Sequence, residues 1–287
     1  MKRILLDNAL ESWTMAVYYC DEILKGKATL IYRKNYVSAL HNAVELFVKQ
    51  RMIDCDKHEI INKKQTKSKK LLDKFYGAQN LNEFFATLPV CELNKLFTET
   101  YSKISDYTDV LFKEYYQEEK ESKIIVDNAL ELLKKLRNAE THFFIDRYNF
   151  LTDIEFKQLH NFMSVFYEIL QEYQLLPFWG DGGFEYKKMQ FTNEKIEEFS
   201  YKDAIINSQF MKELINLVKD NYIITSGESA FEVAYDILND LGDKFDVDRF
   251  SELWVYVEMA LYYNVILIEK CDVPEIDQEY KYLRFCY

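Results

Sequence analysis

The stretch YVSALHNAVELFVKQRMI, residues 36 to 53, has the apolar periodicity of a helix that is buried along one face. The residues on that face are Leu40, Ala43, Val44, Phe47 and Val48. Residues 4 to 24 have a similar helical pattern of apolar and polar residues. We therefore predict two long amphipathic helices, over residues 4 to 24 and 33 to 54, at the start of the chain.

The composition favours helical structure along the whole chain. Of the 287 residues, 48% are hydrophobic and 16% aromatic, which is enough for a sizeable core. Only 7 glycines and 3 prolines are present, so the turn residues that a strand-rich fold needs are scarce. We predict an all-α fold. Further helices are expected over residues 68 to 76, 80 to 87, 91 to 118, 122 to 146 and 152 to 174, the last behind a capping box of Thr152 and Glu155.

The segment PFWGDGG, residues 177 to 183, holds three of the seven glycines and is the best candidate for a domain boundary. We expect a helical domain over residues 1 to 176, a linker over 177 to 184, and a smaller helical C-terminal domain over 185 to 287. In the C-terminal domain, helices are predicted over residues 201 to 219, 229 to 241 and 248 to 270.

Charge is unevenly distributed along the chain. The net charge is −12, which argues against coating of nucleic acid by bulk electrostatics. Residues 57 to 74 nevertheless carry seven lysines against two acids, a local charge of +5. Two interpretations stay open: this segment is a solvated loop, or it is a binding site for phosphates. In the second, RNA would bind through Lys63, Lys64, Lys69 and Lys70.

Several classes of site are not expected. The five cysteines have no zinc-ligand spacing, and the chain has no glycine-rich phosphate loop, so we predict neither a metal nor a cofactor. Acids interrupt the apolar stretches near the start and near residues 254 to 268, which argues against a signal peptide or a membrane span and favours the cytoplasm. His41 and His160 are interpreted as isolated packing or surface residues.

The stretch LKKLRNAETHFF, residues 133 to 144, combines an arginine, an asparagine and a histidine within one predicted helix. At about 100° per residue, Asn138 and His142 share a face, with Arg137 and Thr141 along its edge. The neighbouring face is apolar and is expected to face the core. Its members are Ile125, Ala129, Leu132, Leu133, Leu136 and Phe143. Arginine stabilises phosphate charge and histidine transfers protons near neutral pH, so this group has the chemistry for RNA cleavage without a metal.

The sequence RNAETH resembles the signature of HEPN domains, helical nucleases whose motif is an arginine, usually a polar residue, and a histidine after four to six intervening positions. Arg137, Asn138 and His142 match this motif position by position. The two long helices at the start of the chain resemble such domains as well. The resemblance covers residues 1 to 176 and implies a HEPN-like antiparallel helical bundle. A second pair, Arg51 and His58, has an apolar Met52 after the arginine and is expected to be divided by a helix end.

The resemblance implies an endoribonuclease that acts as a homodimer on an RNA substrate. His142 would transfer protons, Arg137 would bind the scissile phosphate, and Asn138 would orient the pair, with Thr141 as possible support. Glu45 is a second possible support, although an ordinary pair between Glu45 and Lys49 on a helix surface is the simpler interpretation.

The family also implies a role as a toxin or in antiviral defence by abortive infection, with a trigger or regulatory partner acting through the C-terminal domain. One residue departs from the antitoxin-modified members, which have a tyrosine two positions after the histidine. Here that position holds Phe144. The alternative function is a non-catalytic helical interaction protein, in which Arg137 and His142 are buried in an interface.

Overall fold

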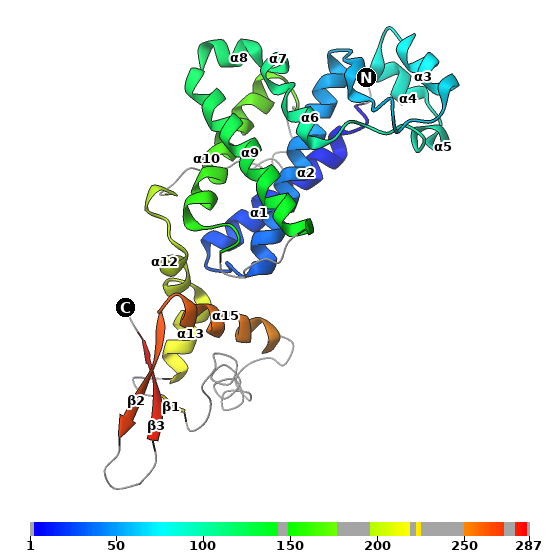
Figure 1. The fold of residues 1–287 in the computed structure, drawn as a ribbon. Helices are drawn as coiled ribbons and strands as arrows, with labels where there is room; N and C mark the ends of the chain where they lie inside the picture. The colour runs from blue at the N-terminus through cyan, green and yellow to red at the C-terminus, as the bar shows by residue number, and fades with distance from the viewer. Residues whose placement is uncertain are drawn as a thin grey trace, which may run out of the picture. The chain divides into compact units, whose positions relative to one another are not determined.

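The computed structural model describes residues 3–142, 149–176, 196–218, 222–224, 250–272 and 279–285. Most of these residues are helical, so the predicted all-α class is confirmed (Figure 1). The chain divides into two compact units. The N-terminal unit contains residues 1–19 and 34–196, and the C-terminal unit contains residues 20–33 and 197–287. The expected linker at 177–184 lies outside the described residues.

Four long helices form most of the N-terminal unit, together with shorter ones. They are α1 (Leu6–Leu24), α2 (Leu30–Asp54), the 3-10 helix η1 (His58–Ile60), α3 (Lys69–Tyr76), α4 (Leu81–Thr87), α5 (Val90–Leu93), α6 (Tyr101–Ser105), α7 (Thr108–Leu111), α8 (Lys113–Glu118), α9 (Lys120–His142) and α10 (Asp153–Glu172). The capping box predicted at the start of α10 is present, with Thr152 and Glu155 bonding each other's backbone.

The helical structure expected over residues 91 to 118 is not continuous, because four short helices, α5 to α8, occupy this part of the chain. Between α5 and α6 the backbone pairs with the segment after α2 instead of continuing a helix. The amide of Asn62 donates to the carbonyl of Phe97 at 2.8 Å, and the amide of Glu99 donates to the carbonyl of Ile60 at 2.8 Å. Ile61 and Thr98 thereby form an antiparallel bridge.

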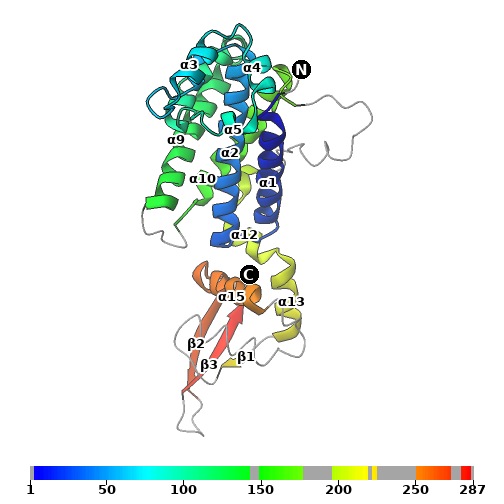
Figure 2. The same ribbon diagram turned by 90° about the vertical axis from the view of Figure 1, so that its right-hand side faces the viewer.

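The long helices of the N-terminal unit pack as antiparallel pairs. The start of α1 meets the end of α2, where the amide of Leu5 donates to Gln50 Oε1 at 3.0 Å. The end of α9 meets the start of α10, where Lys135 Nζ lies 3.1 Å from Glu155 Oε1. Both views show these four helices gathered in one bundle, with α3, α4 and α5 beside the C-terminal end of α2 (Figures 1 and 2).

Aromatic side chains fill the centre of this bundle. Phe166 of α10 is fully buried, and its ring centroid lies 6.2 Å from that of Trp13 on α1 and 6.3 Å from that of Phe47 on α2. Phe112 approaches the same ring at 6.3 Å from the segment between α7 and α8. Edge-to-face contacts, such as those of Phe166 with Phe47 and Phe112, are a favoured geometry of aromatic pairs, so this ring joins α10 to three other segments.

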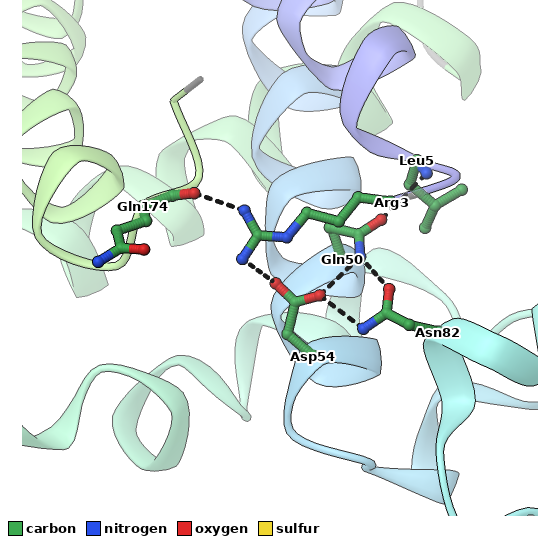
Figure 3. A network of polar contacts seen from close by, with 6 residues as sticks. All are labelled: Arg3, Leu5, Gln50, Asp54, Asn82 and Gln174. Carbon is green, nitrogen blue, oxygen red and sulfur yellow. Dashed lines mark hydrogen bonds and ion pairs between the residues drawn. The ribbon is translucent and has the colours of Figure 1, made fainter. Parts of the chain in front are cut away.

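A polar network ties the N-terminus to three other segments of the same unit (Figure 3). Arg3 Nη2 lies 2.9 Å from Asp54 Oδ2 at the end of α2, and Arg3 Nη1 donates to the carbonyl of Gln174 after α10. Gln50 and Asn82 both donate to Asp54 Oδ1, each at 2.9 Å. The partly buried carboxylate is therefore matched by several donors, as an ionised group away from water requires.

The C-terminal unit contains both helices and strands. Its elements are η2 (Ile196–Glu198), which begins at the division, α12 (Tyr201–Ile206), α13 (Gln209–Val218), β1 (Tyr222–Ile224), α15 (Phe250–Tyr262), β2 (Ile266–Asp272) and β3 (Glu279–Phe285). The strands form an antiparallel sheet of order β1-β3-β2, in which Leu283 pairs with Tyr222 and with Ile268. The expected helix at 229–241 lies outside the described residues.

The helix predicted over residues 248 to 270 is wrong in its last part, because α15 ends at Tyr262 and β2 follows. The backbone turns at Asn264, whose φ is 54°, and the amide of Val265 donates back to the carbonyl of Ala260 at 2.8 Å. This left-handed residue terminates the helix in the manner of a C-terminal cap. The sequence predicts a purely helical C-terminal unit, whereas this unit contains both helices and strands.

The turn between α1 and α2 packs within the C-terminal unit. Gly26 has a φ of 93°, and a Cβ atom there would lie 2.5 Å from the carbonyl oxygen of Ala204. Only glycine combines this backbone conformation with so close an approach. The fully buried Arg33 adds a second contact, with its guanidinium carbon 5.2 Å from the ring centroid of Tyr201.

Candidate active site

Helix α9 carries the arginine and asparagine of the motif at its C-terminal end. Ala129, Leu132, Leu133 and Leu136 are buried as predicted, whereas Ile125 is only half-buried. Arg137 is half-buried and Asn138 is exposed. The two polar side chains therefore lie at the edge of the packed face, where a ligand can reach them.

The histidine of the motif is the last residue of the same helix, because α9 ends at His142. The backbone thus keeps Arg137, Asn138 and His142 on one continuous helix. The side chains of Thr141 and His142, and all of Phe143 and Phe144, lie outside the described part of the chain. Their predicted roles remain predictions.

Helix α2 presents a row of polar side chains, His41, Glu45 and Lys49, at successive four-residue intervals. His41 Nδ1 lies 3.9 Å from Glu45 Oε2, and Lys49 Nζ contacts Glu45 Oε1. Lys49 Nζ also donates to the hydroxyl of Thr98 at 2.8 Å. The expected pair of Glu45 with Lys49 is present, but its placement on the helix surface is wrong, because Lys49 is buried and also bonds Thr98.

Tyr101 of α6 extends this group. Its ring stacks on His41 with centroids 4.0 Å apart, and its hydroxyl donates to the carbonyl of Leu130 on α9 at 3.4 Å. Burial, and then the charge of Glu45, raise the pKa of the Tyr101 hydroxyl, so the phenol stays neutral. We call His41, Glu45, Lys49, Thr98 and Tyr101 the polar cluster.

The charge of Arg137 reaches the polar cluster. Burial lowers the pKa of His41 below its ordinary value, the Glu45 carboxylate opposes this shift, and the positive charge of Arg137 adds to it. The charges of Glu45 and Arg137 therefore act on the His41 pKa in opposite directions. His41 is buried, in agreement with its interpretation as a packing residue, but it is not isolated, because it stacks on Tyr101 and lies near Glu45. The sequence signal for it was the four-residue spacing to Glu45, which alone is common on helices.

The lysines of the segment 57–74 separate into two pairs. Lys63 and Lys64 line a pocket of about 430 Å³, whereas Lys69 and Lys70 are exposed in the first turn of α3. The segment is folded rather than an open loop, since it contains η1, the bridge at Ile61 and the start of α3.

Arg51 and His160 pack against aromatic rings. Arg51 and His58 are divided by the end of α2 at Asp54, as predicted. The guanidinium carbon of Arg51 lies 4.6 Å from the ring centroid of Tyr173. His160 is buried in α10, with its ring centroid 6.4 Å from that of Phe156.

Comparison with protein-family models, with curated proteins and with solved structures finds no match to the chain. Among the described helices, none is long and apolar enough to cross a membrane. The same residues hold no group of three or more His, Cys, Asp or Glu side chains arranged to bind a metal ion. The candidate site must therefore be assessed from its own chemistry.

Proposed function

We propose that this protein is a metal-independent endoribonuclease of HEPN type that acts as a homodimer. The observation that carries the proposal is that Arg137, Asn138 and His142 belong to one helix, which ends at the histidine. The exposure of Asn138 and the partial exposure of Arg137 favour contact with a ligand over a purely internal role.

In the proposed reaction the ribose 2′-hydroxyl attacks the adjacent phosphorus atom and the bond to the 5′-oxygen breaks. His142 of one copy accepts the proton of the hydroxyl, and the leaving 5′-oxygen takes a proton from the protonated His142 of the second copy. Arg137 holds the phosphate oxygens, on which negative charge increases in the transition state. The products are a 2′,3′-cyclic phosphate and a 5′-hydroxyl. Asn138 orients the phosphate or the arginine, and the polar cluster supports the position of Arg137.

The first test is cleavage of a labelled single-stranded RNA by the purified protein in EDTA. We expect activity to persist, because histidine and arginine chemistry needs no metal. His142→Ala should reduce the rate by 10²-fold or more, the usual range for loss of a proton-transfer group. The circular dichroism spectrum should not change, because His142 ends α9 and lies outside its apolar stripe. EDTA inhibition that magnesium reverses would contradict the proposal.

A role as a toxin or antiviral effector completes the proposal, with the C-terminal unit as the part that receives a trigger or a regulatory partner. Induced expression in a bacterial host should then arrest growth, because cleavage of cellular RNA stops translation. His142→Ala at the same expression level is the matched control and should permit growth. Equal growth arrest by both proteins would separate the toxicity from the proposed site.

A further inference from the structure

A pocket of about 430 Å³ lies in the N-terminal unit, where the segment after α2 meets α3 and α6. Its lining includes His58, Lys63, Lys64, Tyr76 and Tyr107. The volume is within the range of pockets that bind small ligands. Aromatic rings and cations on the same pocket wall are a combination that suits a nucleotide, which presents a flat base and an anionic phosphate.

The cationic side of the pocket is held in place by a hydrogen-bonded turn. Asn62 Oδ1 accepts from the amides of Lys64 and Gln65, both at 3.1 Å. Asn62 Nδ2 donates to Glu99 Oε2, also at 3.1 Å. Lys63 and Lys64 are therefore carried by a fixed backbone, although their side chains are exposed. Such a turn gives two cations a defined position for one phosphate.

Tyr76 supplies a surface for stacking. Its side chain is 37% exposed, and the ammonium of Lys63 lies 4.3 Å from its ring centroid. The ring of His58 stacks against it at 5.7 Å and 27°. An incoming base can replace the ammonium over the ring, because base stacking exceeds an exposed cation–π contact in strength. The displaced ammonium of Lys63 then becomes available to the phosphate.

Two acids also line the pocket, and they are not equivalent. Glu99 lies 3.1 Å from Lys103 Nζ and accepts from Asn62, so its charge is already compensated. Glu59 is exposed and leaves a carboxylate that can accept hydrogen bonds from the amino groups of a base. With the exposed Lys63 and Lys64 on the same wall, phosphate is not repelled.

The pocket is joined to the polar cluster through one short segment. Lys49 of the cluster donates to Thr98, Thr98 pairs with Ile61, and the next residue, Glu99, lines the pocket. The pocket lining and the polar cluster are therefore connected through residues 98 and 99.

We propose that this pocket receives one nucleotide, with its base stacked on Tyr76 and its phosphate held by Lys63 and Lys64. The inference rests on the proposed function only in expecting that the nucleotide belongs to an RNA strand. A free mononucleotide offers the same chemistry, so the test contains an arm for each source.

The test is fluorescence anisotropy with a fluorescein-labelled 12-nucleotide 2′-O-methyl RNA. This probe has no free 2′-hydroxyl along its chain, so its binding does not depend on cleavage. Tyr76→Leu should weaken binding about tenfold, the loss expected for one stacked base. Tyr76→Phe keeps the ring and should bind within about twofold of the wild type. Unfolding of each variant is followed by circular dichroism to exclude a general loss of structure.

The lysines supply a control that is matched in charge. Lys63→Gln/Lys64→Gln should weaken binding and flatten its salt dependence, because two phosphate contacts are lost. Lys69→Gln/Lys70→Gln removes the same charge from the same segment, outside the pocket lining, and should have a much smaller effect. Equal weakening by the two pairs, wild-type binding by Tyr76→Leu, or no binding of either probe by the wild type would overturn the proposal.

The second probe, adenosine 5′-monophosphate, distinguishes the two sources. If adenosine 5′-monophosphate displaces the labelled RNA at concentrations comparable to the Kd of that RNA, the natural ligand is a free mononucleotide. If displacement needs concentrations far above the Kd of the RNA, the natural ligand is a strand. Binding that depends on Tyr76 without any RNA cleavage would contradict the proposed nuclease activity but support the proposed nucleotide site. Cleavage that depends on His142, with binding independent of Tyr76, would support the nuclease activity and contradict the nucleotide site.

Discussion

His41 lies where its neutral form is favoured. Burial lowers its pKa first, Glu45 opposes this, and the charges of Arg137 and Lys49 lower it further. A folded pKa below the unfolded value, about 6.5, means that the unfolded chain takes up a proton first as the pH falls. The free energy of unfolding contributed by His41 is therefore complete above that value and decreases below it, until the folded protein is also protonated.

We predict that the wild type loses more stability between pH 7.5 and pH 5.5 than His41→Phe does. The phenylalanine keeps a ring that can stack on Tyr101, and it removes the titration. Urea unfolding of both proteins at the two pH values measures the difference. An identical loss in the two proteins would show that His41 does not carry this dependence.

Gly26 is the residue at which a single methyl group should disturb the C-terminal unit. Alanine there would be strained at a φ of 93° and would place Cβ 2.5 Å from a backbone oxygen. We expect Gly26→Ala to destabilise the protein by about 2 to 3 kcal/mol. Gly77→Ala is the control, because Gly77 has a φ of −84° and its Cβ would have 3.3 Å to the nearest atom. Equal stability of the two variants in thermal unfolding would contradict this account.

The sequence predicts site residues only where one element carries them. Arg137, Asn138 and His142 belong to one helix, so their spacing alone places them together. His41 was missed because its significance depends on Arg137 of another helix and on Tyr101 of a third. Tyr76 and the pocket were missed for the same reason, since they depend on the pairing of residues 60–62 with 97–99.

Phe166 of α10 contacts aromatic rings from three other segments of the bundle. We expect Phe166→Ala to cost about 3 to 5 kcal/mol, because the rings of Trp13, Phe47 and Phe112 would face a cavity. Ile154→Ala on the same helix is the control: Ile154 is 76% exposed, so we expect a change within about 0.5 kcal/mol. Chemical denaturation measures both. Similar costs would mean that the buried ring is not the main contact of α10.

At the level of elements, local periodicity predicts α1, α2, α9 and α10 to within a few residues at their described ends. These helices are long, and each repeats its apolar pattern over several turns. The errors lie where distant segments pair. Residues 97–99 bond to 60–62, and β2 pairs with β3, so neither structure is visible in a local pattern. A short apolar run such as residues 266–268 fits both a helix and a strand, so the sequence alone does not distinguish the two.

For the whole molecule, the proposed function requires two copies of the chain. We expect light scattering to give twice the chain mass of 34.4 kDa. Specific activity should fall on dilution below the dissociation constant of the dimer, because each cleft is expected to contain two copies of the motif. A stable monomer whose activity per molecule does not change with concentration would contradict the dimeric site.

In the proposed mechanism, Arg137 and His142 cleave RNA by attack of the RNA's own 2′-hydroxyl on the adjacent phosphate. The most direct measurement is analysis of the product ends after digestion of a defined RNA in EDTA by the wild type, His142→Ala and Arg137→Lys. The wild type should leave 2′,3′-cyclic phosphates and 5′-hydroxyls. Both variants should be strongly impaired, since lysine keeps the charge of Arg137 but not its two-point contact with phosphate. Products with 5′-phosphates, or undiminished cleavage by His142→Ala, would contradict the account.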